Sequence, residues 1–160
     1  MTKEKIPTTP AILALKAQRA DFTMHTYSYE ERGGTKRGAS KLGVDEHCVI
    51  KTLVMEDETS KPLIILMHGD KEVSTKSLAR IIGVKSISPC KPAIAEKHTG
   101  YKVGGTSPFS TKKTMPIYME STIADLPEIF INAGSRGLLV RMPSDELIRI
   151  LKPIAVSAAI

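Results

Sequence analysis

The chain has 160 residues, a hydrophobic fraction of 41% and a charged fraction of 25%, values typical of a globular domain and not of a disordered segment. No apolar run reaches the roughly 20 residues of a membrane span, and the first ten residues lack the apolar centre of a secretory signal. We therefore expect a cytoplasmic protein with no membrane partner. Two cysteines are too few for a disulfide framework, and the net charge of +6 favours a polyanionic partner without requiring one.

The first half of the chain alternates between helix and strand signals. Thr9 is a good N-cap, and Pro10 suits the first helical position. Two β-branched apolar runs separated by polar residues are typical of a β-hairpin with a longer turn. The expected elements are a helix over 10–19, a strand over 22–29, a loop over 30–38, a short helix ending at Gly43, and hairpin strands over 48–57 and 62–69.

The second half mixes the same signals, with Ser144 as the expected cap of the last helix. The expected elements are a helix over 74–83, a brief strand over 85–89, a helix over 92–100, strands over 115–121, 128–134 and 137–143, and a helix over 144–152, before a tail that packs or frays. This order predicts a single α+β domain over residues 1–160 with an antiparallel or mixed sheet.

A lysine stands in the middle of the first hairpin strand, in CVIKTLVM. Alternation places Lys51 on the same strand face as Val49, Leu53 and Met55. An unpaired ammonium inside a core is prohibitively costly, so this face must open onto water or an anion. An edge-strand lysine that prevents aggregation explains the residue as well as a functional lysine does.

Two glycine turns follow. The segment YKVGGTSPFS, residues 101–110, contains consecutive glycines, which let the backbone approach a ligand and turn its N–H groups toward a phosphate, a carboxylate or an oxyanion. The segment NAGSRG, residues 132–137, is a second glycine-containing turn, between two predicted strands. Each turn alone is more often a tight loop or a hairpin.

Together, VIKTLV, GYKVGGTSPF and INAGSRGLLV, in that order and after a helix and HTY, resemble the YbaK/prolyl-tRNA synthetase editing-domain family. This family includes freestanding bacterial Cys-tRNA(Pro) deacylases, and the resemblance runs from about Thr8 to Leu151. It implies a mixed, barrel-like sheet with flanking helices, and hydrolysis of an aminoacyl ester on the wrong tRNA. The implied partner is a mischarged tRNA, a prolyl-tRNA synthetase is a candidate second partner, and no cofactor is expected.

The resemblance also implies roles for residues. Lys51 corresponds to the family's essential strand lysine, facing a cleft and contacting the substrate's terminal adenosine or aminoacyl end. Gly104 and Gly105 belong to the loop whose backbone would hold the ester carbonyl. The other implied substrate-binding residues are Tyr27, Thr106, Ser107, Pro108, Asn132, Gly134 and Gly137.

Many relatives carry SGGKRGLD where this chain has NAGSRGLL, so a carboxamide replaces a hydroxyl at Asn132 and Leu139 replaces a carboxylate. The choice between cysteine and another small amino acid therefore stays open. In the cysteinyl deacylases the substrate's own thiol is thought to attack its carbonyl, which matches a sequence without a nucleophile elbow. The alternatives are editing of another misacylated tRNA such as Ala-tRNA(Pro), and a non-catalytic module that binds an aminoacyl-tRNA or a synthetase.

The remaining reactive and charged residues give weaker signals. The four histidines, at positions 25, 47, 68 and 98, lack metal-ligand spacing, so no metal site is expected. His47 next to Cys48 could activate a thiol, but alternation turns Cys48 away from Lys51, and burial is the better interpretation. Candidates for tRNA phosphate contacts are Lys36, Arg37, Lys112 and Lys113, although a solvated basic surface explains them nearly as well.

Overall fold

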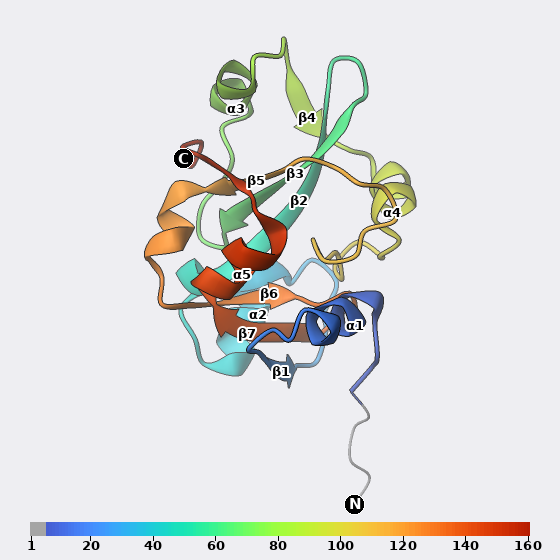
Figure 1. Ribbon diagram of the computed structural model, residues 1–160, viewed down its shortest axis with the longest axis vertical. Helices are drawn as coiled ribbons and strands as arrows, with labels where there is room; N and C mark the ends of the chain where they lie inside the picture. Colours follow the sequence, from blue (N-terminus) through green and yellow to red (C-terminus); the bar gives the residue numbers. More distant parts are fainter. Residues whose placement is uncertain (1–5) are drawn as a thin grey trace, which may run out of the picture.

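The two apolar runs form the expected hairpin. In the computed structural model, which describes residues 6–160, β2 (Val49–Asp57) and β3 (Pro62–His68) pair antiparallel at the centre of an eight-stranded sheet (Figure 1). A second antiparallel pair, β6 (Glu128–Asn132) and β7 (Leu138–Pro143), lies beside it because β6 runs parallel to β2. Residues 1–5, which belong to the segment where the sequence predicts no secretory signal, lie outside the described residues.

The sheet is mixed, as expected. Its strand order is β1-β7-β6-β2-β3-β5-β8, and β4 pairs with β2 outside this path. The parallel contacts are β2 with β6, β3 with β5, and β5 with β8. The remaining strands are β1 (Thr23–Thr26), β4 (Ile87–Pro89), β5 (Ile117–Glu120) and β8 (Ile154–Val156).

Within residues 6–160, five α-helices and two short 3-10 helices surround the sheet (Figure 1). Their bounds are α1 (Pro10–Ala17), α2 (Gly34–Leu42), α3 (Thr75–Ile82), α4 (Pro92–Thr99), α5 (Ser144–Leu151), η1 (Glu46–Cys48) and η2 (Ser121–Asp125). Thr9 caps α1 by accepting a hydrogen bond from the Ile12 N–H, and Ser74 caps α3 in the same way. No helix within residues 6–160 has the length and apolar character to cross a bilayer.

Two sequence expectations differ from the structure, and the tail, expected to pack or fray, packs as a strand. Helix α2 begins at Gly34, inside the predicted loop, because Gly38 and Ala39 are buried against the sheet and tertiary packing outweighs the low helix propensity of glycine. Ser144 is the first residue of α5 and not its cap, since its hydroxyl donates to the Leu126 carbonyl. The tail adds strand β8, beyond which the Ala158 N–H donates to the buried Glu120 carboxylate.

The alternation of β2 separates two cores. Ile50 and Val54 belong to the main core, which also contains side chains of α1 and α5. Met55 belongs to a second cluster beneath α3, and Leu53 packs against that cluster. Lys51 therefore lies on the strand face that the sequence predicted.

Candidate active site

The outer edge of β2 is only partly paired. Strand β6 pairs with residues 49–50 of this edge, and β4 pairs with residues 55–57. In the part of the chain that the structure describes, no strand pairs with residues 51–53 on this side, although β3 pairs with all three on the other. A cleft of about 960 Å³ opens at this gap in the sheet.

The cleft extends around the free edge of β2, because residues of both strand faces line it. Its walls come from the segments on either side of the gap. Besides residues 49–55 they include Tyr27, Tyr29, residues 30–38, Glu46, Gly69, Glu72, Val73, Thr75, Pro89, Cys90, Pro92, Ala95, Val103, Gly104, Thr106, Asn132, Arg136 and Leu139.

The Lys51 side chain lies in this cleft in a partly enclosed position, with 19% of it exposed. Its Nζ donates to the Lys71 carbonyl at 2.7 Å and to Glu72 Oε1 at 3.3 Å. An ammonium has three N–H donors, so one is left for a ligand. Because the Glu72 side chain is 79% exposed, this ion pair is weak and serves mainly to orient the lysine.

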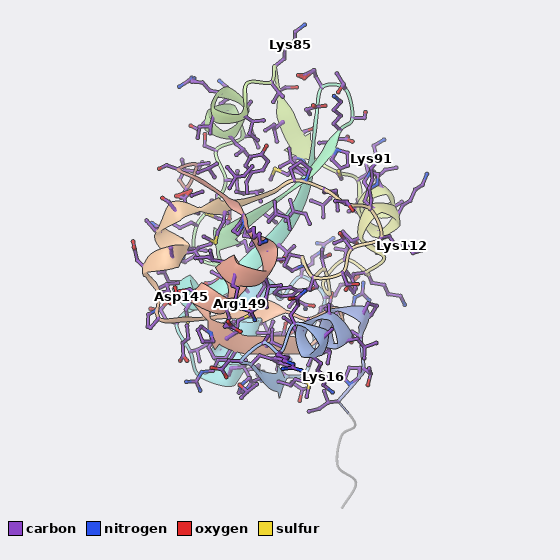
Figure 2. The ribbon with its side chains drawn as sticks, in the orientation of Figure 1. Lys16, Lys85, Lys91, Lys112, Asp145 and Arg149 are labelled. Atoms are coloured by element: carbon purple, nitrogen blue, oxygen red, sulfur yellow. The ribbon has the colours of Figure 1, made fainter. Side chains whose placement is uncertain are left out.

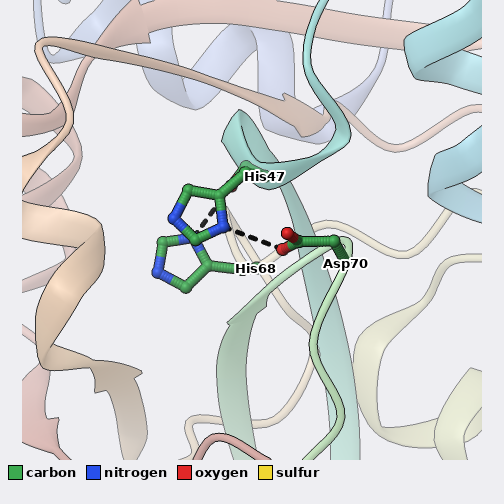
Figure 3. Close-up of side chains that lie close together, drawn as sticks. All are labelled: His47, His68 and Asp70. Atoms are coloured by element: carbon green, nitrogen blue, oxygen red, sulfur yellow. Dashed lines mark hydrogen bonds and ion pairs between the residues drawn. The ribbon is translucent and has the colours of Figure 1, made fainter.

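A stacked histidine pair stabilises residues 70–72, the segment whose groups accept hydrogen bonds from Lys51 (Figure 3). The rings of His47 and His68 lie face to face, with centroids 3.8 Å apart and planes 5° from parallel. His47 Nδ1–H donates to Asp70 Oδ1 at 2.8 Å. Burial is the largest single influence on the pKa of Asp70 and acts to raise it. The hydrogen bond from His47, the charges of His47 and Lys71 and a backbone hydrogen bond together outweigh burial, so the pKa lies below its usual value. Asp70 directly precedes Lys71 and Glu72, so the pair anchors the partners of Lys51.

The same three side chains have ligand atoms within 4.8 Å of one another, close enough to raise the question of a metal ion. Both His68 nitrogens are engaged, Nδ1 with the His47 carbonyl at 2.8 Å and Nε2 with Thr122 Oγ1 at 2.7 Å. Nitrogen lone pairs lie in the ring plane, so parallel rings direct them side by side and not toward one ion. This geometry suits side chains that stabilise the local structure better than it suits metal ligands.

Tyr101 closes the base of the glycine loop. Its hydroxyl donates to the Phe109 carbonyl at 2.6 Å, and burial raises the pKa of Tyr101 to about 12, which keeps the hydroxyl a donor. Ser107 is fully buried, and its Oγ accepts from the Phe109 N–H at 3.2 Å. Ser107 and Pro108 therefore shape the turn from beneath.

The two glycines make close contacts that a side chain would prevent. Gly104 has φ +92°, and a Cβ there would lie 2.5 Å from the Tyr29 hydroxyl. A Cβ on Gly105 would lie 2.8 Å from the backbone nitrogen of Arg136 in the second turn. The Gly105 N–H itself donates to the Lys102 carbonyl at 2.8 Å. The loop thus packs directly against the second turn, as two glycines allow.

Asn132 and Arg136 join the two turns. Asn132 Nδ2 donates to the Gly104 carbonyl at 3.3 Å and the Ser135 carbonyl at 3.1 Å, while its Oδ1 accepts from the Gly134 N–H at 2.7 Å. Arg136 Nε donates to the Val103 carbonyl at 2.9 Å. The carboxamide at position 132 therefore connects the glycine loop to the second turn.

Asn132→Asp will test this connection. A carboxylate still accepts from the Gly134 N–H but cannot donate to the two carbonyls, so we expect kcat/KM for a reaction in this cleft to fall about 10-fold at neutral pH. Lowering the pH will recover activity in the variant, because protonation of the introduced carboxylate restores an O–H donor, and wild type supplies the reference pH profile. Equal activity of the two proteins at neutral pH would contradict this role.

The structure brings some of the expected site residues to the cleft and leaves others outside it. Lining the cleft are Lys51, Tyr27, Gly104, Thr106, Asn132, Lys36 and Arg37. Outside its lining lie Gly105, Ser107, Pro108, Gly134, Gly137, Lys112 and Lys113. Arg37 is also engaged within the protein, since it donates to Glu30 Oε2 at 2.6 Å and to the Ser28 carbonyl at 2.7 Å.

The two cysteines differ in position. Cys90 lines the cleft, whereas Cys48 Sγ donates to the Asp45 carbonyl at 2.9 Å. Burial raises the pKa of both thiols, which disfavours the thiolate form. His47 is hydrogen-bonded to Asp70, so the structure gives no support to an activated Cys48.

Sequence reasoning missed Tyr29, Glu72, Arg136 and the stacked histidines. Their contacts join segments far apart in the chain, such as Val103 and Arg136, which are 33 positions apart. Only charge type and the nearby glycine turns could have suggested Arg136. Neither Glu72 nor the histidine pair carries a local sequence signal.

Comparison with known proteins is consistent with this geometry. The Aminoacyl-tRNA editing domain family matches residues 30–150. A protein of Enterococcus faecalis, provisionally named Cys-tRNA(Pro)/Cys-tRNA(Cys) deacylase EbsC, is 25% identical over 141 residues, covering 88% of this chain and 86% of its own. The proline–tRNA ligase of Thermodesulfovibrio yellowstonii is 29% identical over 112 residues, covering 70% of this chain but only 18% of the ligase.

Solved structures share the fold. A crystal structure of a hypothetical protein superposes with a TM-score of 0.86 at 18% identity, covering 95% of this chain and 100% of that one. A structure provisionally described as a trans-editing enzyme for prolyl-tRNA synthetase gives 0.82 at 18% identity, covering 96% and 98%. The sheet, the glycine turns and the match over residues 30–150 together show that this chain belongs to the aminoacyl-tRNA editing domain family, of the YbaK type.

Proposed function

We propose that this protein deacylates a mischarged tRNA, and that its substrate is Cys-tRNA(Pro). The observation that carries the proposal is the Lys51 ammonium, oriented by two acceptors in a cleft that it shares with the Gly104 loop. The similarity to the protein named EbsC supports cysteine as the amino acid.

The proposed step uses the thiol of the substrate. Its sulfur attacks the ester carbonyl carbon, the bond from this carbon to the ribose oxygen breaks, and the thiol proton passes to the ribose oxygen. Free tRNA leaves, and water hydrolyses the cyclic thioester to cysteine. An amino acid without a thiol cannot take this route, so discrimination lies in the substrate as well as in the pocket.

The residues of the chain position and stabilise this step. The remaining N–H of Lys51 would donate to the developing oxyanion or to the ribose oxygens, and Gly104 and Thr106 line the same cleft. The Gly105 N–H already donates to Lys102, so Gly105 acts through the shape of the loop. No protein nucleophile is needed.

A panel of esters tests the proposal. Deacylation rates are measured for Cys-tRNA(Pro), Ala-tRNA(Pro), Ser-tRNA(Pro) and S-methylcysteinyl-tRNA(Pro). We expect rapid cleavage of the cysteinyl ester alone. Cleavage of the alanyl or S-methylcysteinyl ester at a similar rate would show that the protein hydrolyses esters without assistance from a substrate thiol. Stoichiometric binding without turnover of any ester would support a non-catalytic module.

We propose that the tRNA footprint, the set of residues that contact tRNA phosphates, includes Lys112 and Lys113 beside α4. The Lys112 and Lys113 N–H groups donate to the carbonyls of Thr99 and His98 at the end of α4, which fixes this segment near the cleft wall at Ala95. Figure 2 shows Lys112 and Lys91 on the same flank of the molecule.

Replacing Lys112 and Lys113 together with alanine will weaken tRNA binding and reduce the slope of log K against log salt concentration by about 1 to 2, because fewer counterions are released. The control removes the same charge at Lys16 and Lys85, which lie at opposite ends of the molecule (Figure 2). An unchanged slope in the first variant, or an equal decrease in the control, would remove both lysines from the footprint.

A further inference from the structure

The free edge of β2 presents unpaired peptide groups to the cleft. In an antiparallel strand the N–H and C=O of one residue point to the same edge, and successive residues alternate. The Asp57 N–H donates to Lys61 on the β3 side, whereas the Val54 carbonyl accepts from the Cys90 N–H on the outer side. The even-numbered residues of β2 therefore face outward. The N–H and C=O of Thr52 and the N–H of Val54 point into the gap.

These groups lack partners in the protein. Within residues 6–160 neither β6 nor β4 reaches Thr52, and no other backbone hydrogen bond involves the Thr52 peptide groups or the Val54 N–H. The Thr52 hydroxyl is also buried without a partner among the described residues. Native proteins pair most of their buried polar groups, and exceptions call for an explanation such as a bound ligand. Thr52 and Val54 both line the cleft.

We propose that this edge binds the adenine of the substrate's terminal nucleotide, a proposal that rests on the proposed function. The Thr52 carbonyl would accept from the adenine 6-amino group, and the Val54 N–H would donate to ring N1. The Thr52 carbonyl and the Val54 N–H are an acceptor and a donor side by side on one strand edge. They match the adenine edge, which offers one donor beside one acceptor, in the same way that they would match a neighbouring strand.

The aminoacyl end of the substrate fits this edge less well. It carries an ammonium donor and an ester carbonyl acceptor, but the proposed function places that carbonyl, the reacting group, at Lys51 and the Gly104 loop. The adenine offers a donor and an acceptor side by side that take no part in the reaction. Apolar atoms of Pro89, Pro92 and Ala95 also line the cleft and suit the flat face of a base. Placing the adenine here leaves Lys51 and the Gly104 loop for the ester.

The test changes the base and leaves the protein intact. Cys-tRNA(Pro) is prepared with terminal adenosine, with purine riboside, which lacks the 6-amino group, and with 1-deazaadenosine, which lacks N1. The matched control carries 7-deazaadenosine, which retains both groups. We expect kcat/KM to fall about 10-fold or more for the first two replacements and to stay unchanged for the control. Equal rates for all four, or a loss confined to the control, would overturn the proposal.

A second readout does not depend on catalysis. Adenosine is titrated into the ¹⁵N-labelled protein, and we expect the amide signals of Thr52 and Val54 to move while those of Leu53, which faces β3, move less. Unchanged Thr52 and Val54 signals at saturating adenosine would overturn the edge site. If native Cys-tRNA(Pro) is cleaved and the base replacements do not change the rate, this inference is refuted and the proposed function stands. If no ester is cleaved, the proposed function is refuted, and the adenosine titration alone decides whether the edge binds adenine.

Discussion

Lys51→Ala will lower kcat/KM for aminoacyl-tRNA deacylation at least about 100-fold, the scale observed when one preorganised donor to a developing oxyanion is removed. Two acceptors hold the ammonium in place, Lys51 lines the cleft, and one N–H is left for a ligand. The free energy of unfolding will change by less than about 1 kcal/mol, because the ion pair with the exposed Glu72 side chain contributes little. Single-turnover kinetics and thermal denaturation measure the two effects.

Lys71→Ala is the matched control for charge. It removes a neighbouring lysine side chain but keeps the carbonyl that orients Lys51, so activity should stay within about twofold of wild type. Lys51→Arg separates charge from position, since a guanidinium cannot reproduce the donor geometry of an ammonium. Wild-type rates in Lys51→Ala would remove the lysine from the chemistry.

Gly104→Ala will damage both activity and stability. The residue has φ +92°, a backbone conformation that costs an L-residue roughly 1–2 kcal/mol, and the new Cβ would displace Tyr29. Tyr29 lies under the Arg136 guanidinium, whose Cζ is 5.1 Å from the ring centroid, so its movement also disturbs the second turn. Because a shift of about 1 Å at a reacting centre reduces rates about 100-fold, we expect a loss of that order in kcat/KM.

Gly83→Ala supplies the comparison. Gly83 ends α3 with φ +87°, and nothing lies within 4 Å of the position that a Cβ would occupy. This variant has the backbone cost without the contact with Tyr29, so it should lose stability and keep its activity. Equal activity losses in the two variants would show that the effect of Gly104→Ala comes from general destabilisation.

Local signals predicted most of the fold. The β2–β3 hairpin, the capped helix α1 and the glycine at the end of α3 follow from residues close in sequence, and each is confirmed. The end of helix α2 before Gly43 was predicted too, but the start of α2 at Gly34 and strand β8 could not be predicted in this way. The first depends on burial of Gly38 and Ala39 against the sheet, and the second on pairing with β5, which lies far away in the sequence.

The candidate site was predictable only in part. Alternation in β2 placed Lys51 on the correct face, and the Gly-Gly pair indicated a close backbone contact, which the structure places against Tyr29 and the second turn. The gap in the sheet depends on how far β4 and β6 extend along β2, a property of tertiary packing. The contact of Asn132 with the Gly104 carbonyl likewise joins positions 28 residues apart.

The most direct measurement is the rate of Cys-tRNA(Pro) deacylation by the wild-type protein, compared with spontaneous hydrolysis of the same ester in the same buffer. We predict a rate far above the spontaneous one, with multiple turnovers and release of intact tRNA(Pro). A rate equal to spontaneous hydrolysis, at protein concentrations that bind the tRNA, would contradict the proposal that this cleft is a deacylase site.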